Sequence, residues 1–254
     1  MVLNFACVFD LTGLDALAAS PPGQRADIDF VVLPELIDGG YARLHRESGP
    51  RSDVSTVVER LVSISQACRL HLIGGTLALP GSDGRVRNTC LVISHGALAG
   101  RFSKAHLYRP LGDDRFFTRT RPGSVIEVDC RGEPVRIGVI VCYDLRFPET
   151  VRPWFKSGLD ILFVPARWPR VRDDLWQVLL RARAIENQCF VIGVNARDEE
   201  GGGSYAYGPD GKELFALGPD PQPNEPPWYT FAIDLEDIKR VKSRLDTRPD
   251  AWLL

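Results

Sequence analysis

The 254-residue sequence predicts an α/β protein with a mixed, layered sheet. Short apolar runs rich in β-branched residues recur along the chain, each bounded by turn-type or charged residues, which is typical of strands. Two longer segments between these runs have helical periodicity. Some runs are apolar nearly throughout, as expected where both faces of a sheet are covered, whereas one pair forms a hairpin pattern. At this length we expect a single domain over residues 1–254.

The predicted strands are short apolar runs at residues 5–9, 28–33, 70–79, 88–95, 136–144, 160–165, 189–195 and 228–234. The runs 136–144 and 160–165 are almost entirely apolar, so we expect them in the buried centre of a sheet. The run 88–95 continues past Gly96 into further apolar residues, which predicts a hairpin with its turn at Gly96. The Pro-rich segment 218–228 is expected to form a surface loop before the last strand.

Two helices are predicted by apolar residues at helical spacing within residues 52–69 and 172–188. Residues at the N-cap are commonly Ser, Thr, Asp or Asn, because their side chains accept hydrogen bonds from backbone N–H groups that have no partner inside the helix. We therefore expect Ser52 or Asp53 to cap the first helix and Asp173 to cap the second.

Composition limits the classes of partner. The 31 basic and 33 acidic residues give a net charge of -2. They are spread along the chain, so we expect neither nucleic acid nor a membrane as partner. No stretch approaches the ~18 apolar residues of a membrane span, and the N-terminal residues lack the pattern of a secretory signal, which predicts a cytoplasmic protein. The six cysteines lack metal-type spacing, so we expect no disulfide framework, no metal and no other cofactor.

The first segment that could contribute a catalytic residue is VVLPELIDGGY, where an apolar strand ends at Pro34 and Glu35 before a Gly-rich turn. A carboxylate at the end of a strand faces the edge of the sheet and is a candidate general base. A helix-capping or solvated carboxylate is the alternative interpretation.

The second segment is GRFSKAHLYRP, in which Lys104 follows a strand-like stretch among apolar side chains. A lysine held there could stabilise an oxyanion and lower the pKa of a neighbouring thiol, or it could extend from an apolar patch to water. His106 invites a Cys/His pair, but a structural hydrogen bond is the more common role of a single histidine beside apolar residues.

The third segment is PVRIGVIVCYDLRFPE, where a buried strand is predicted to end at Cys142 and a helix to begin near Pro148. Such an elbow exposes the cysteine side chain and directs backbone N–H groups, notably that of Tyr143, towards the same point. This favours Cys142 as a nucleophile over one more buried thiol. Asp144, Arg146 and Glu149 are predicted to fix the elbow as an ion-pair network rather than to take part directly.

Taken together, LPE at 33–35, SKAHLY around Lys104, VCYDLRFPE at 141–149 and RARAIENQCFVIGVN at 181–195 resemble the nitrilase superfamily of carbon–nitrogen hydrolases, in order and in spacing. The resemblance covers nearly the whole chain. It implies a four-layer α-β-β-α sandwich with two mixed sheets, which commonly forms a homodimer through its outer helices. It also implies that Glu35 is the general base, Lys104 the cationic stabiliser and Cys142 the nucleophile.

The sequence departs from the family pattern at two places. Members usually carry a second glutamate a few residues beyond the lysine, where this chain has Asp113. The shorter side chain moves the carboxylate by about 1.5 Å, which puts the substrate in doubt more than the chemistry. The second departure is the link 11–30, in which Pro21, Pro22 and Gly23 interrupt what is usually a longer first helix.

The resulting hypothesis is hydrolysis of a small linear amide. Glu35 takes the proton of Cys142 as the sulfur attacks the carbonyl, and Lys104 and the Tyr143 N–H stabilise the oxyanion. A thioester forms, ammonia leaves and water completes the reaction. The mechanism requires a sulfur that is thiolate-like at neutral pH.

Within the superfamily, the motifs most resemble the ω-amidase-like branch, whose substrates are dicarboxylate monoamides. Alternatives are a deaminated-glutathione amidase, an N-carbamoyl amide hydrolase, an aliphatic amidase, a nitrilase, or a non-catalytic binding module on the same fold. Arg167, Arg170 and Arg172 are candidates for a clamp on a substrate carboxylate, with a solvated basic loop as the alternative. A clamp would favour acidic amides.

Overall fold

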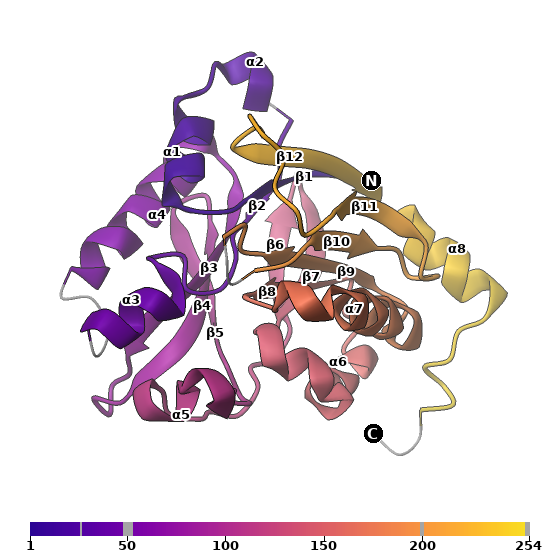
Figure 1. Ribbon diagram of the computed structural model, residues 1–254. Helices are drawn as coiled ribbons and strands as arrows, with labels where there is room; N and C mark the ends of the chain where they lie inside the picture. The colour runs from indigo at the N-terminus through magenta and orange to yellow at the C-terminus, as the bar shows by residue number, and fades with distance from the viewer. Residues whose placement is uncertain (26, 48–52, 199–200, 252–254) are drawn as a thin grey trace.

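Two six-stranded sheets form the centre of the protein in the computed structural model, which describes residues 1–25, 27–47, 53–198 and 201–251 (Figure 1). The first sheet has the order β12-β1-β2-β3-β4-β5 and consists of β1 (Val2–Val8), β2 (Phe30–Val32), β3 (His71–Pro80), β4 (Val86–Ser94), β5 (Ala97–Ser103) and β12 (Trp228–Asp234). The second has the order β11-β10-β9-β8-β7-β6 and consists of β6 (Ile126–Cys130), β7 (Glu133–Val139), β8 (Ile161–Ala166), β9 (Phe190–Asn195), β10 (Ser204–Tyr207) and β11 (Glu213–Leu217).

Helices cover the outer faces of both sheets. The α-helices are α1 (Leu11–Ala19), α2 (Pro22–Arg25), α3 (Gly40–Glu47), α4 (Val54–Cys68), α5 (Asp113–Phe116), α6 (Arg152–Lys156), α7 (Asp173–Asn187) and α8 (Glu236–Arg244). Short 3₁₀ turns are η1 (Arg109–Leu111), η2 (Cys142–Arg146), η3 (Pro148–Thr150) and η4 (Arg170–Arg172). Helices α1 and α4 lie outside the first sheet, and α6 and α7 lie outside the second (Figure 1). The predicted α/β class and the four-layer sandwich are therefore confirmed.

Both sheets are mixed, with three parallel strands flanked by antiparallel ones. Strands β1, β2 and β3 run parallel in the first sheet, and β7, β8 and β9 do so in the second. The carboxyl ends of parallel strands meet at one edge of a sheet, where the chain leaves the sheet and its side chains can converge. This edge is where the chemistry predicted from the sequence is found.

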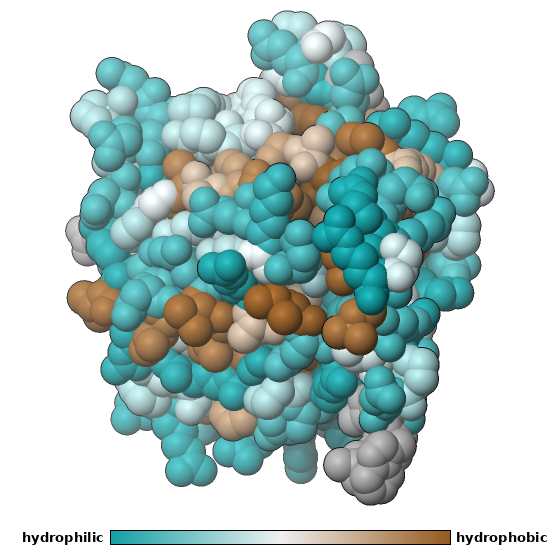
Figure 2. Space-filling view, turned by 90° about the vertical axis from the view of Figure 1, so that its right-hand side faces the viewer, coloured by the Kyte–Doolittle hydropathy of each residue, from teal (hydrophilic) through white to brown (hydrophobic). Residues whose placement is uncertain are grey.

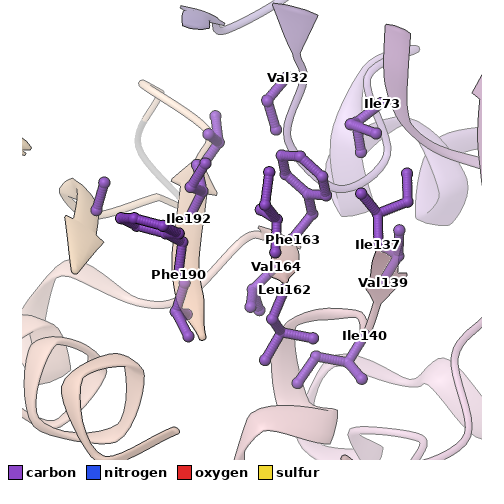
Figure 3. Close-up of a cluster of buried hydrophobic side chains, with 14 of the residues drawn as sticks. Val32, Ile73, Ile137, Val139, Ile140, Leu162, Phe163, Val164, Phe190 and Ile192 are labelled. Carbon is purple, nitrogen blue, oxygen red and sulfur yellow. The ribbon is translucent and has the colours of Figure 1, made fainter. Parts of the chain in front are cut away.

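The space between the sheets is filled by apolar side chains. Val32 and Ile73 of the first sheet point towards Phe163 and Ile137 of the second (Figure 3). These strands alternate little between apolar and polar residues, because the helices bury their outer faces as well. Within the described residues, no helix combines the length and the apolar character needed to cross a membrane.

Most predicted elements are confirmed, including the loop before β12. The predicted hairpin joins β4 to β5, and Gly96 adopts a φ of 87° in its turn. The interruption of the first helix is confirmed as well, since α1 ends before Pro21 and the four-residue α2 begins at Pro22. Strands β6, β10 and β11 were not predicted; they have only 5, 4 and 5 residues, too few to give a clear alternation.

Three boundary predictions need correction or qualification. Asp173 is the first residue of α7 rather than its N-cap, and its carboxylate instead accepts hydrogen bonds from the Gly203 N–H (2.8 Å) and from the Tyr205 hydroxyl. Asp53 occupies the predicted N-cap position of α4, but its side chain makes no capping hydrogen bond to the helix, and Ser52 lies outside the described residues.

The third correction concerns the elbow. Strand β7 ends at Val139, before Cys142, and the segment at Pro148 is a 3₁₀ turn. A helix begins only at Arg152. A left-handed residue at Cys142 and prolines after it prevent a regular helix from starting earlier.

Candidate active site

Glu35, Lys104 and Cys142 come together at one edge of the sandwich. Glu35 follows β2, Lys104 follows β5 and Cys142 follows β7, so each lies just beyond the end of a strand. The Lys104 Nζ atom is 2.7 Å from Glu35 Oε1, and both side chains are fully buried. The Cys142 thiol lies close enough to the Glu35 carboxylate for that carboxylate to raise its pKa. The sequence therefore predicted correctly which residues meet.

The Glu35 carboxylate is held by several donors. Its Oε1 atom accepts hydrogen bonds from Lys104 Nζ and, at 2.8 Å, from Asn88 Nδ2. Its Oε2 atom accepts one from the backbone N–H of Arg167 at 3.1 Å. These contacts fix the carboxylate beside the thiol, as a general base requires. Asn88 was not singled out from the sequence, because an asparagine within a strand gives no signal of what it faces across the sheet.

The backbone of Cys142 is unusual. Its φ is 46°, in the left-handed region, although it carries a Cβ atom. A residue with a side chain pays about 1–2 kcal/mol for this conformation, and such strain is concentrated at functional sites. Cys142 and Tyr143 begin the turn η2, and the leading N–H groups of a helical turn have no partner within it. The predicted elbow thus exists as a tight turn rather than as a strand running into a helix.

The resting thiol of Cys142 holds its proton, which corrects the expectation of a thiolate-like sulfur. Burial raises the pKa of Cys142 well above its ordinary value, and the negative charge of Glu35 raises it further. Lys104 and a hydrogen bond from the Arg167 backbone lower the pKa, but not enough to reverse the shift. A neutral thiol beside a carboxylate can be deprotonated as it attacks, so the base must act in the same step.

The elbow is fixed by Asp144 in a way that the sequence did not predict. The buried Asp144 carboxylate accepts hydrogen bonds from the backbone N–H groups of Val141 (3.0 Å) and His106 (2.7 Å), and lies 2.9 Å from His106 Nδ1. It therefore ties the nucleophile turn to the segment that carries Lys104. The ring of His106 stacks on Phe147 with centroids 3.8 Å apart, so the structural role of His106 is the correct one.

The predicted ion-pair network at the elbow is wrong. No salt bridge joins Asp144, Arg146 and Glu149 in the described part of the chain. The Arg146 guanidinium instead lies over the ring of Trp168, 4.9 Å from its centroid, and lines the pocket. Asp144 is occupied by backbone donors because a buried carboxylate is best satisfied by fixed N–H groups close by.

Asp113 lies in the same cluster. One of its carboxylate oxygens is 2.8 Å from Lys104 Nζ and accepts a hydrogen bond of 2.8 Å from the Tyr108 N–H. Asp113 is fully buried, whereas the neighbouring Asp114 is exposed and faces Arg109 at 3.9 Å. Asp113, the position at which the sequence departs from the family pattern, thus contacts the lysine.

Lys104 stays charged in this setting. Burial by itself lowers the pKa of a lysine, but the negative charges of Glu35 and Asp113 outweigh burial and raise the pKa of Lys104 well above its ordinary value. A permanently charged ammonium in a water-poor site suits the stabilisation of an oxyanion.

Tyr41 is a member of the site that the sequence did not reveal. Its hydroxyl donates to Asp113 Oδ1 at 2.7 Å, accepts from Lys104 Nζ at 3.2 Å, and lies 3.2 Å from Glu35 Oε1. The side chain comes from the first turn of α3 and is buried. The only sequence signal was its place after the Gly-rich turn that follows Glu35.

A pocket opens above the cluster and leads to the thiol. Tyr, Trp and Arg side chains form much of its wall, and its lining consists of Tyr41, Lys104, Tyr108, Leu111, Cys142, Tyr143, Arg146, Arg167, Trp168, Pro169 and Arg172. The ring of Tyr143 packs against that of Tyr108, with centroids 5.0 Å apart. A small, partly apolar molecule with an anionic end fits such a lining.

Of the three arginines proposed as a clamp, Arg167 reaches the site but its guanidinium binds protein groups. Its Nε atom donates to the Glu35 carbonyl at 2.8 Å and its Nη2 atom to the Leu36 carbonyl at 3.2 Å, while Nη1 pairs with Asp198. Arg167 therefore holds the backbone at the general base candidate and at the residue after it.

The other two arginines of the predicted clamp lie in different places. Arg170 faces Asp220 at 3.4 Å on an exposed loop and lines a neighbouring pocket, so the solvated-loop interpretation holds for it. Arg172 lines the pocket above Cys142, with its Nη1 atom 3.3 Å from the Tyr108 hydroxyl.

Comparison with known proteins gives consistent results. Residues 14–243 match the family described as carbon-nitrogen hydrolase. The chain is 30% identical to the 2-oxoglutaramate amidase of Bacillus subtilis, over 88% of this chain and 86% of the relative. It is 33% identical to the omega-amidase YafV of Yersinia enterocolitica, over 85% and 81% of the two chains. In fold it is similar to the CN-hydrolase superfamily protein XC1258 of Xanthomonas campestris, with a TM-score of 0.80, 24% identity, and coverage of 99% and 97%.

Proposed function

The chain belongs to the carbon-nitrogen hydrolase family and is an amide-hydrolysing enzyme, and on this premise we propose that it hydrolyses the terminal amide of a small dicarboxylic acid monoamide. The observation that carries the proposal is the buried contact of Glu35 and Lys104 beside the Cys142 thiol, at the base of a pocket with arginines in its wall. The amidase names of two relatives support the reaction class.

The geometry supports a two-step reaction. As Cys142 Sγ attacks the amide carbon, Glu35 takes the thiol proton, and Lys104 and the Tyr143 N–H stabilise the oxyanion. Collapse of the tetrahedral intermediate breaks the C–N bond, and Glu35 gives its proton to the nitrogen, so that ammonia leaves and a thioester remains. Water then attacks the thioester with Glu35 as base, and the acid product leaves as the thiol is restored.

Substrate selection rests on the arginines that line the pocket. Arg146 lies against Trp168, and Arg172 lies beside the Tyr108 hydroxyl. A guanidinium binds a carboxylate through two parallel hydrogen bonds, so these side chains suit the free acid end of a monoamide. Arg167 has a different part in this proposal, because it positions Glu35 through the backbone.

A panel of substrates assayed for ammonia release tests the function. We expect monoamides of four- and five-carbon dicarboxylic acids, with or without a 2-oxo group, to exceed neutral amides of equal length by at least ~10-fold in kcat/KM. Nitriles and N-carbamoyl compounds should be poor substrates. Equal turnover of neutral and acidic amides would contradict the acidic-substrate proposal, and a preference for a carbamoyl compound or a nitrile would replace it.

Variants of Arg172 separate binding from chemistry. We expect Arg172→Gln to raise KM for acidic monoamides by ~10-fold or more with little change in kcat, because the lost contact is made equally in the ground and transition states. For a neutral amide the same variant should behave as the parent protein does. Arg170→Gln is the matched control, since Arg170 lies outside the pocket wall and faces Asp220.

We also propose that the protein is a homodimer formed through the α7 side. Figure 2 shows a face of the molecule that is crossed in its lower half by a band of hydrophobic residues, with a second apolar area above it. Helix α7 exposes Leu175, Val178 and Ile185, with 63% of Val178 accessible. Exposed apolar bands of this kind are typical of interfaces between proteins. Val178→Glu should yield monomers in sedimentation analysis, and an unchanged mass would contradict this interface. The cytoplasmic location stays a prediction from the sequence.

A further inference from the structure

The cluster around Lys104 contains an imbalance of charge. One ammonium lies between two carboxylates, 2.7 Å from Glu35 and 2.8 Å from Asp113, with the Cys142 thiol nearby. A single positive charge cannot neutralise both carboxylates, and like charges at close range in a water-poor site repel strongly. A neutral hydrogen-bond donor can relieve part of this repulsion without adding a second cation.

Tyr41 is placed to be that donor. Its hydroxyl contacts Asp113, Lys104 and Glu35, at 2.7, 3.2 and 3.2 Å. Burial and the neighbouring negative charges raise the pKa of Tyr41 well above its ordinary value, so the hydroxyl keeps its proton. That single proton can point to one carboxylate at a time, and rotation about the C–O bond redirects it without moving any heavy atom.

We propose that Tyr41 is a positioning residue for amide hydrolysis, which fixes Lys104 between the two carboxylates and shares its single proton between Asp113, the nearer acceptor, and Glu35. The inference rests on the proposed roles of Glu35, Lys104 and Cys142. In each half-reaction Glu35 alternates between carboxylate and acid, so the need for a donor at Oε1 appears and disappears. A rotating hydroxyl follows this change, whereas a fixed N–H such as that of Asn88 does not.

The test is the kinetics of Tyr41→Phe, which removes one oxygen atom from a buried ring. We expect kcat to fall ~10- to 100-fold, the scale of one hydrogen bond to a charged group, with KM nearly unchanged. The acid limb of the kcat/KM profile should move to higher pH, because losing a donor favours the protonated form of a carboxylate. A merely structural role would not move this limb. The groups facing the hydroxyl are Glu35, Lys104, Asp113 and Cys142.

Tyr207→Phe is the matched control, because Tyr207 is a buried tyrosine on β10, away from the pocket lining. It should leave kcat and the pH profile as they are in the parent protein. A Tyr41→Phe protein whose kcat and acid limb equal those of the parent would overturn the inference. Cys142→Ala in the same assay distinguishes failure of this inference from failure of the proposed function. An active Cys142→Ala protein would contradict the proposed function itself.

A second variant covers the case in which Tyr41→Phe does not fold. Site-specific 3-fluorotyrosine at position 41 keeps the hydroxyl and nearly the same shape, but its phenol is a stronger acid and a stronger donor. We expect the acid limb of kcat/KM to move to lower pH, opposite to the Tyr41→Phe shift. An acid limb at the parent pH in the fluorinated protein would also overturn the inference.

Discussion

Two buried thiols lie at opposite ends of the same strand pair. Cys130 ends β6 and pairs with Glu133, the first residue of β7, whereas Cys142 follows the other end of β7. Both belong to the core between the sheets. Burial is the largest influence on each thiol, raising the pKa of Cys130 to about 12 and that of Cys142 well above its ordinary value. Neither burial nor pKa therefore distinguishes the reactive thiol from the structural one.

The neighbours distinguish them. Cys130 Sγ lies 3.4 Å from Nε2 of His71, whose pKa burial and the nearby His95 lower to about 4, so this partner is a neutral imidazole. Cys142 instead has a carboxylate and an ammonium beside it, on a left-handed backbone that opens into a pocket. A nucleophilic thiol needs a buried pair of opposite charges beside it, whereas a structural thiol packs more favourably without such a pair.

The largest effect that can test this comparison is loss of the nucleophile. We expect Cys142→Ala to lower kcat by at least ~10³-fold while the protein stays folded, because no other group can form the thioester. Cys130→Ala removes a thiol of similar burial and should retain activity within about twofold. Equal losses in the two variants, measured as ammonia release, would show that the position of the charges does not select the nucleophile.

The next effect separates the charges from one another. We expect Glu35→Gln to lower kcat by at least ~10²-fold, the usual scale for a general base. Lys104→Ala should lower kcat similarly and also destabilise the protein by about 3–5 kcal/mol, because it leaves two carboxylates buried without their cation. Urea unfolding of both variants measures the difference. A fully stable Lys104→Ala protein would mean that water or protonation compensates for the missing charge.

The third effect is a dependence of stability on pH, caused by His71 at the other end of the sandwich. An unfolded histidine takes up a proton near pH 6.5, whereas His71 in the folded state does so only at about pH 4. The unfolded state therefore binds more protons between these values, and the free energy of unfolding falls as pH drops through this window, by up to about 3 kcal/mol. His71→Phe, which keeps an aromatic ring against Phe30, should remove this loss.

The control for the acid effect is His45→Phe, since His45 is exposed on α3. This variant should keep the parent's dependence of stability on pH between 6.5 and 4. Denaturant midpoints at several pH values within this window are sufficient to compare the proteins. An identical pH dependence in the His71→Phe and parent proteins would mean that the imidazole takes up its proton without opening the core.

The fold could be predicted where local pattern and burial agree. Residues 160–165 are apolar throughout, and the structure places them in β8, in the centre of the second sheet. The runs that became β10 and β11 carry no comparable pattern, because short strands near a sheet edge are stabilised by pairing rather than by their own sequence. The end of β7 at Val139 was missed for a related reason, since apolar residues continue to Cys142 beyond the last ladder pair.

The site could be predicted where a residue type and its place after a strand identify it, as with Glu35 and Cys142. Tyr41 and Asn88 could not be found in this way, because each acts through contacts to residues more than 50 positions away or on another element. Asp144 was misassigned because sequence shows its charged neighbours but not the backbone donors of the Lys104 segment. Long-range hydrogen bonds are the information that a linear pattern lacks.

The smallest expected effect concerns Asp113, which shares Lys104 with Glu35 and whose carboxylate also accepts hydrogen bonds from Tyr41 and the Tyr108 N–H. Asp113→Asn keeps the shape and removes the charge, so Lys104 retains only Glu35 as a full counter-charge. We expect kcat/KM to fall about 10-fold, less than for Glu35→Gln, because the amide can still accept one hydrogen bond from the ammonium or from Tyr41.

Asp113→Glu should be milder in kcat but should change the preference between four- and five-carbon amides, since the added methylene displaces Lys104. Asp114→Asn is the control, because Asp114 is exposed and faces Arg109 rather than Lys104. Kinetics of these three variants on the best substrate of the panel would separate a carboxylate that orients the lysine from one that merely fills the core, and a parent-like Asp113→Asn protein would exclude the former.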